Sequence, residues 1–177
     1  FEARKSNEIN QSSGVSVRVT INNFESIISN AEKRALRCKE NDIVPRISDL
    51  HSVLASTNGK IEMEYVGEDK KEDDLVEKLL NRSILKVFDQ YFSLNSLQKA
   101  VEFFNSGWGM EVSDQIASQD YLEGIKEIPG VKEAIRTLGI QEAPSLMASA
   151  TEFVLEGLHL HQKLNKEIEG GRATYGK

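Results

Sequence analysis

Two arginines lie where a cation can be held in place to meet an anion. Arg18 follows the small-residue run SSGVSV and shortly precedes a helical pattern, and Arg46 follows Pro45 at the start of another. A short connection into a helix restrains a side chain more than an exposed helix face does. Because a guanidinium fork matches phosphate oxygens, both arginines are candidate phosphate contacts, Arg46 as a secondary or interface contact. The alternative is that each pairs with a nearby carboxylate or carbonyl.

The remaining side chains form no complete catalytic or metal-binding motif. Gly59-Lys60 lacks the glycine-rich approach of a phosphate loop, and no GxSxG sequence is present. His159 and His161 are two residues apart, so on a helix their rings point in different directions and cannot share a metal ion. His161 is expected to be a hydrogen-bonded core or interface residue. We therefore predict no metal site, no cofactor and no ATPase activity for this chain alone.

The charge distribution argues against nucleic acid as the main partner. The net charge is −6, and the first 60 residues carry nine Lys and Arg against seven Asp and Glu. A small basic cluster is expected on the exposed flank of the first long helix, without the interleaved aromatic residues of a nucleic-acid interface. Its members are Lys33, Arg34, Arg37 and Lys39.

Composition also bears on the cellular compartment and the fold class. The 177 residues are 39% hydrophobic and 28% charged, which is typical of a globular protein. No apolar run approaches 18 residues, so no membrane span is predicted. The single cysteine, Cys38, excludes an internal disulfide framework, fits a reducing compartment such as the cytoplasm, and is expected to pack in the core.

Helical periodicity covers most of the chain and predicts a mainly α fold, a bundle of about seven helices. The first long helix is expected to be capped by Thr20 and to bury a stripe that includes Ile21 and Phe24. Residues 60–66 alternate apolar and acidic side chains, so they form either a short strand, with residues 110–112 as the partner in one small β-hairpin, or a continuation of a helix. The other expected helices span 46–58, 73–92, 96–105, 118–126, 130–138 and 144–168, followed by a frayed tail.

Three segments resemble one protein family. SGVSVRVTINNFESIISNAEKRAL is similar to the lid subdomain of AAA+ ATPases of the magnesium chelatase I-subunit and MoxR-like group. In that group the sensor-2 arginine enters the first lid helix behind a small-residue run, as Arg18 does here. The later segments PRISDLHSVLASTNGKIEMEYV and ATEFVLEGLHLHQKLNKEIEGGRATYGK resemble the C-terminal half of bacterial magnesium chelatase ATPase subunits. Together the resemblance covers nearly the whole chain.

The resemblance implies a division of the chain and a set of partners. Residues 1–19 would be a linker with the sensor-2-like junction, 20–66 the lid-like helices, and 67–177 a helical extension for partner contacts. Arg18 would reach the γ-phosphate of ATP, which is held with Mg²⁺ on a preceding AAA+ core domain. The intact parent would assemble with neighbouring subunits in a ring and act on a partner, such as a protein bearing a von Willebrand A-like domain. It would couple ATP hydrolysis to metal insertion or to protein remodelling.

A second interpretation stays open at this stage. The sequence begins at Phe1 rather than Met, which favours a C-terminal fragment of a longer ATPase. The absence of any complete catalytic motif is equally compatible with a stand-alone helical interaction module that has no link to nucleotides. A nucleic-acid accessory domain that uses the basic cluster is a third, weaker interpretation.

Overall fold

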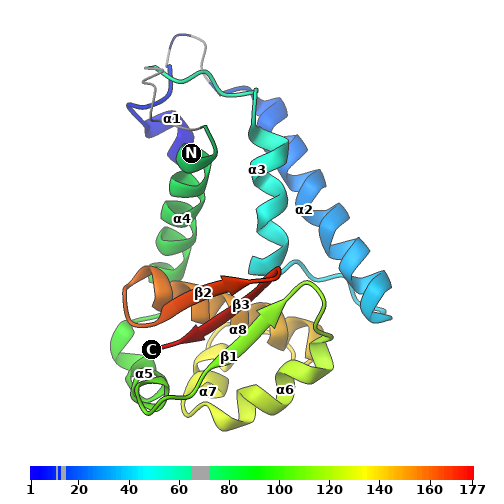
Figure 1. The fold of residues 1–177 in the computed structure, drawn as a ribbon, viewed down its shortest axis with the longest axis vertical. Coiled ribbons are helices and arrows are strands. Elements are labelled where there is room, and N and C mark those ends of the chain that lie inside the picture. Colours follow the sequence, from blue (N-terminus) through cyan, green and yellow to red (C-terminus); the bar gives the residue numbers. More distant parts are fainter. Residues whose placement is uncertain (11, 13–14, 65–71) are drawn as a thin grey trace.

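The computed structural model describes residues 1–10, 12, 15–64 and 72–177 and confirms a mainly α fold with a small antiparallel sheet (Figure 1). The described residues form eight α-helices, two 3₁₀ helices and three strands. The helices are α1 (Glu2–Lys5), α2 (Val17–Cys38), η1 (Ile47–His51), α3 (Ser52–Thr57), α4 (Glu72–Tyr91), η2 (Leu94–Leu97), α5 (Gln98–Asn105), α6 (Ser118–Glu127), α7 (Val131–Arg136) and α8 (Pro144–Leu160). The strands are β1 (Met110–Ser113), β2 (Asn165–Glu169) and β3 (Arg172–Gly176).

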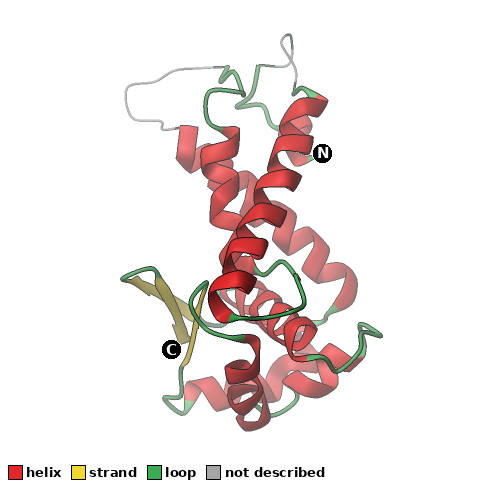
Figure 2. Ribbon diagram, turned by 90° about the vertical axis from the view of Figure 1, so that its right-hand side faces the viewer, coloured by secondary structure: helices red, strands yellow, loops and turns green. Residues whose placement is uncertain are grey.

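Helices α2, α3 and α4 rise above a lower body made of α5 to α8 and the sheet (Figure 1). Helices α2 and α3 pack side by side, and α4 contacts both α3 and α8. The sheet lies at one side of the lower helices (Figure 2). Helix α4 therefore joins the upper helices to α8 of the lower body.

Helix α8 is the centre of the main hydrophobic core. Its sequence is apolar on most sides, and Val154, Leu155 and Leu158 are fully buried. A helix that is hydrophobic nearly all round must be covered by other elements. Here α4, α6, α7 and η1 all pack against it.

Helix α2 begins earlier than the sequence pattern predicts. The hydroxyl of Ser16, not of Thr20, caps the helix by accepting a hydrogen bond from the backbone N–H of Arg18 at 3.2 Å. Arg18 therefore lies in the first helical turn rather than in the approach to it. The helix ends at Cys38, and the following residue, Lys39, adopts the left-handed conformation with φ 56°. The expected buried stripe is also wrong in its first half, because Ile21 and Phe24 are exposed.

The last helix is shorter than predicted and the tail is not frayed. Helix α8 ends at Leu160, and the chain then forms a hairpin in which β2 and β3 pair antiparallel, with Asn165 opposite Gly176. The glycines Gly170 and Gly171 form the turn with φ values of 56° and 80°, the left-handed conformation that a two-residue hairpin requires.

The expected pairing of residues 60–66 with 110–112 is also wrong. Strand β1 pairs with β3, with Val112 opposite Ala173, so the sheet order is β1-β3-β2. Met63 instead forms a single antiparallel bridge with Ile9. Residues 65–71 lie outside the described part of the chain. Strand β3 of the C-terminal hairpin pairs with β1 along all four of its residues.

A second, smaller core joins the two sides of the boundary expected between residues 66 and 67. Ile9 and Ile61 pack with Leu75 and Leu79 of α4 in one buried cluster. The upper helices therefore share a core with the N-terminal segment. None of the helices in the described residues combines the length and apolarity needed to cross a membrane.

Candidate functional site: a polar groove and a buried arginine network

Arg18 is exposed on the first turn of α2. Among the described residues, no acceptor forms a hydrogen bond or ion pair with its guanidinium. The adjoining apolar residues Val17, Ile21 and Phe24 are also exposed, and their spacing of four and three places them on one helix face. One end of α2 thus presents an available cation beside an uncovered apolar strip.

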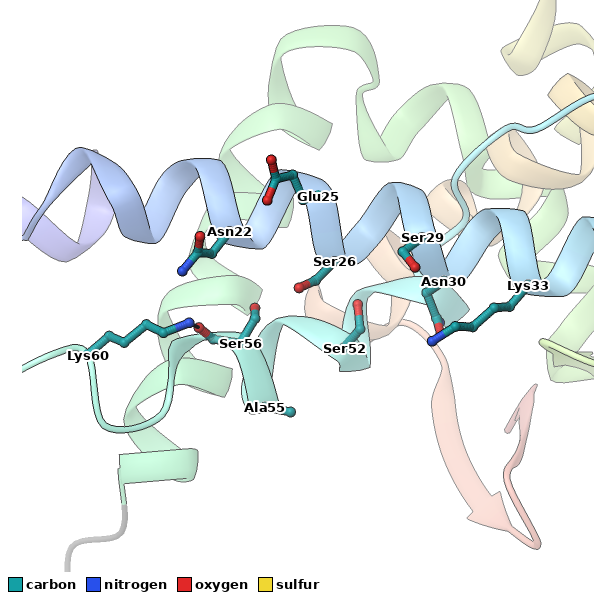
Figure 3. Close-up of a pocket in the computed structure, with 10 residues that line it drawn as sticks. All are labelled: Asn22, Glu25, Ser26, Ser29, Asn30, Lys33, Ser52, Ala55, Ser56 and Lys60. Carbon is teal, nitrogen blue, oxygen red and sulfur yellow. Dashed lines mark hydrogen bonds between the residues drawn. The ribbon is translucent and has the colours of Figure 1, made fainter.

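A polar groove of about 550 Å³ runs between α2 and α3 (Figure 3). Figure 3 shows Lys60 at one end and Lys33 toward the other, with serine hydroxyls between them. Arg18 is one helical turn before Asn22, the first α2 residue of the groove. The lining is Asn22, Glu25, Ser26, Ser29, Asn30, Lys33, Ser52, Ala55, Ser56 and Lys60.

The groove carries more positive than negative charge. Glu25 is its one acidic lining residue among the described side chains, against the two lysines, and Arg18 adds a third cation near one end. The α3 hydroxyls are already used: Ser52 donates to the carbonyl of Asp49 at 2.8 Å, and Ser56 donates to Asn23 at 2.6 Å. Lys60 also already donates to the carbonyl of Ser56 at 2.6 Å. The groove can therefore attract an anion electrostatically, with Lys33 and Arg18 as the cations that have no partner among the described residues.

Arg46 is enclosed by acceptors of the chain itself. Its guanidinium donates to the carbonyl of Ile116 at 2.8 Å, to Glu40 at 3.1 Å and to the hydroxyl of Ser118, and it lies 4.7 Å from the centre of the Tyr121 ring. Arg46 is 2% exposed. Arg46 thus pairs with a carboxylate and a carbonyl, which is the alternative to a phosphate contact that the sequence left open. A phosphate or interface contact from Arg46 would require this network to open.

Arg34 corrects the prediction of an exposed basic cluster. It is 1% exposed and donates to both carboxylate oxygens of Asp49, to Glu40 at 3.1 Å and to the carbonyl of Val44 at 2.6 Å. Arg37 is exposed but is paired with Asp114 at 2.8 Å. The sequence pattern placed both arginines on the same flank, whereas the structure turns Arg34 inward because buried carboxylates compensate its charge.

Glu40 bridges the two buried arginines, a role that the sequence did not indicate. Its two oxygens accept from Arg46 and Arg34, and Oε1 also accepts from the backbone N–H of Ser118. Burial by itself would raise the pKa of Glu40, but the hydrogen bonds from Ser118 and the two guanidinium charges hold this pKa below its ordinary value of 4.5. The network thus connects the end of α2 to the start of α6.

We expect the protein to lose stability in acid partly through Glu40. Since the folded pKa is lowered, the unfolded chain binds the proton more readily, so this contribution is present above pH 4.5 and is lost as the pH falls toward the folded pKa. Urea unfolding measured from about pH 6 to about pH 3 should show a flatter pH dependence for Glu40→Gln than for the wild type. Glu102→Gln, an exposed change on α5, is the control. A Glu40→Gln profile parallel to the wild type would contradict the role of this carboxylate.

Glu152 is a fully buried carboxylate that the sequence did not indicate. It accepts from the backbone N–H of Ser48 at 2.7 Å, from the Ser48 hydroxyl and from the Tyr121 hydroxyl at 2.5 Å. Burial raises the pKa of Glu152, and burial together with the charge of Glu152 raises the pKa of Tyr121. Its signal in the sequence is a charged residue inside the apolar run of α8. These hydrogen bonds join α8 to η1 and α6, so Glu152 holds these three helices in their relative positions.

The histidines and the cysteine are separate from these networks. His161 lies 2.8 Å from Asp89, and Nδ1 of His159 lies 3.1 Å from the carbonyl of Leu164. In the described part of the chain, no group of three or more His, Cys, Asp or Glu side chains is arranged to hold a metal ion. Cys38 is half-buried, and burial raises the pKa of its thiol.

Comparison with known proteins assigns nothing further to these residues. No family model, no curated protein and no solved structure matches this chain. A function for the groove and for Arg18 therefore rests on the residues themselves.

Proposed function

We propose that this chain is the lid subdomain and helical extension of an AAA+ ATPase of the magnesium chelatase I-subunit and MoxR-like group, acting in the cytoplasm. The observation that carries the proposal is the available Arg18 guanidinium on the first turn of α2, beside the exposed strip of Val17, Ile21 and Phe24. A lid that packs against a core domain needs an uncovered apolar face, and a phosphate sensor needs a cation without an internal partner. Both features are at the same end of one helix.

In this proposal Arg18 is half of a nucleotide site. The core domain holds ATP and Mg²⁺ through a phosphate loop, and Arg18 donates hydrogen bonds to the γ-phosphate and stabilises the charge that develops on it. The contact exists with the triphosphate and is lost after hydrolysis, so the position of α2 depends on the nucleotide. Because Glu40, Arg34 and Arg46 join α2 to the lower body, movement of α2 would also move the lower body. Neighbouring ring subunits and a partner protein would receive that movement, and the work performed would be metal insertion or remodelling of the partner.

The test is ATP turnover by the full-length parent with Arg18 replaced. We expect Arg18→Ala to lower turnover by about tenfold or more, because removal of a charge-stabilising donor raises the barrier to phosphoryl transfer. Arg82→Ala is the matched control, since Arg82 is also an exposed arginine on a long helix. Turnover of Arg18→Ala within twofold of the wild type would overturn the role of Arg18. Unfolding curves of both variants exclude a loss of fold as the cause.

The exposed strip also favours a second candidate function, a helical interaction module without nucleotide chemistry. In that case Val17, Ile21 and Phe24 bind a separate protein instead of a core domain. The gene sequence upstream of residue 1 separates the two functions. A phosphate-loop motif about 200 residues earlier, the length of one AAA+ core domain, supports the ATPase, and a start codon immediately before residue 1 supports the module.

A further inference from the structure

A second cavity, separate from the groove beside Arg18, lies between the upper helices and the sheet. It has a volume of about 590 Å³, within the range of small-molecule sites, and is bounded by η1, α3, α4, α8 and one face of the sheet. Part of the wall is aliphatic: Leu54 comes from α3, Leu80 and Ile84 from α4, and Val112 and Ala173 from the sheet. Such walls suit the hydrocarbon part of a ligand.

The floor of the cavity contains a buried carboxylate that already binds an ammonium group. Glu156 of α8 is 4% exposed, and its Oε2 accepts from the Lys166 ammonium at 2.7 Å and from the Tyr175 hydroxyl. The Lys166 nitrogen also lies 5.4 Å from the centre of the Tyr175 ring. A carboxylate together with an aromatic face is a favourable environment for an amine cation. No donor among the described residues reaches the other oxygen, Oε1.

Two imidazoles add further acceptors to the lining. Nδ1 of His159 faces the carbonyl of Leu164 at 3.1 Å, and Nδ1 of His51 faces the carbonyl of Ser48 at 2.6 Å. Because a carbonyl can only accept, Nδ1 of each ring carries the proton, and in the neutral ring Nε2 is an acceptor. Both rings line the cavity.

The lining contains further charged groups besides Glu156 and Lys166. Asp114 is paired outward with Arg37 at 2.8 Å, and Arg172 is paired with Glu111 at 2.9 Å. Glu77 adds a carboxylate at the wall. The lining therefore carries three carboxylates, Glu77, Asp114 and Glu156, against two cations, Lys166 and Arg172, and this excess of negative charge favours a ligand that carries a positive charge.

We propose that this cavity binds a small organic amine. The ammonium group donates to Oε1 of Glu156 and to Nε2 of His159, and the hydrocarbon part lies against Leu54, Leu80 and Ile84. Although Lys166 offsets part of the charge of Glu156, the lining keeps a net negative charge that disfavours a carboxylate of the same length. An alcohol lacks the charge that makes the hydrogen bond to Glu156 strong. The site uses none of the residues proposed to act in nucleotide sensing, so either proposal can fail alone.

The probes for the test are hexylamine, 1-hexanol and hexanoate, titrated into the full chain with methyl-labelled Ile, Leu and Val. We expect hexylamine to shift the methyl resonances of Ile84 and Val112 saturably, with a dissociation constant at least tenfold below that of hexanol, and hexanoate to give no saturable shift. Equal binding of hexanol and hexylamine would overturn the proposal, since it would show that only the apolar walls act. Saturable binding of hexanoate, or no saturable shift with hexylamine, would overturn it as well.

Two variants locate the binding. Leu54→Trp fills the cavity and should abolish the hexylamine shifts, whereas Leu36→Trp, at an exposed position of α2, should leave them unchanged. Glu156→Gln keeps the shape of the side chain and removes its charge, so it should weaken hexylamine binding at least tenfold. If Glu156→Gln fails to fold, Leu54→Trp and the three probes still decide the matter. Shifts that persist in a folded Leu54→Trp protein would contradict the assignment.

Discussion

Replacement of Gly157 by alanine is expected to destabilise the protein by roughly 3 kcal/mol, at the upper end for an overpacked core. A Cβ atom at this position would lie 2.0 Å from Cδ2 and 2.3 Å from Cε2 of Phe88. Phe88 is fully buried and cannot move aside easily, because its ring lies 5.2 Å from that of Phe92, 5.9 Å from that of Phe153 and 5.5 Å from that of His161. The close approach of α4 and α8 therefore depends on this glycine.

The matched control is Gly124→Ala in the middle of α6. Its Cβ would meet the flexible end of Met110 at 3.2 Å, a contact that a small movement of the methionine relieves. Alanine is favoured over glycine inside a helix by about 0.5–1 kcal/mol, so this variant should be neutral or slightly stabilised. Urea unfolding measures both. A Gly157→Ala protein as stable as Gly124→Ala would show that α4 and α8 do not pack as closely as described.

The helices that the sequence predicts correctly have a clear helical periodicity of apolar residues and clear boundary residues. The helix expected over 73–92 is α4 (Glu72–Tyr91), and the helix expected over 118–126 is α6 (Ser118–Glu127). Pro129 and Gly130 end the α6 pattern before α7, and Gly130 adopts φ 81° there. Local periodicity and breaker residues are sufficient in these segments because each helix buries one continuous face.

The C-terminal hairpin was missed because two patterns overlap in the same residues. Leu164 and Ile168 continue the four-residue spacing of α8, which favours a longer helix. Gly170-Gly171 is a hairpin signal in the same stretch, but two glycines near a chain end are also typical of a frayed tail. The pairing of β3 with β1, across about 60 residues of chain, decides between the two patterns. Sequence patterns of neighbouring residues cannot predict a contact between such distant segments.

Sequence spacing is also insufficient to predict which arginines are buried. Arg18, Arg34 and Arg46 all stand near polar, helix-forming sequence, yet the first is exposed and the other two are buried. The acceptors that enclose Arg46 include Ile116 and Ser118, which are at least 70 residues away in the chain. Burial of a charge depends on whether distant acceptors reach it, so spacing alone could not separate the available cation from the structural ones.

The largest electrostatic effect is expected for Arg34→Ala, which should lower the free energy of unfolding by about 3–5 kcal/mol. The substitution leaves the carboxylate of Asp49, which has no exposed surface, without the guanidinium that compensates its charge. It also removes one of the two cations at Glu40 and the donor to the Val44 carbonyl. An unpaired buried carboxylate costs far more than the loss of an ion pair in water.

Arg37→Ala is the control, because it removes an arginine from the same helix at a site where the side chain is 53% exposed and paired with Asp114. An exposed pair of this kind contributes about 0–1 kcal/mol. The double variant Arg34→Ala/Asp49→Asn should recover part of the loss, since it removes the uncompensated charge and keeps an acceptor for the backbone N–H of Arg46. Equal effects of Arg34→Ala and Arg37→Ala in urea unfolding, or no recovery in the double variant, would contradict a buried charge network between α2 and η1.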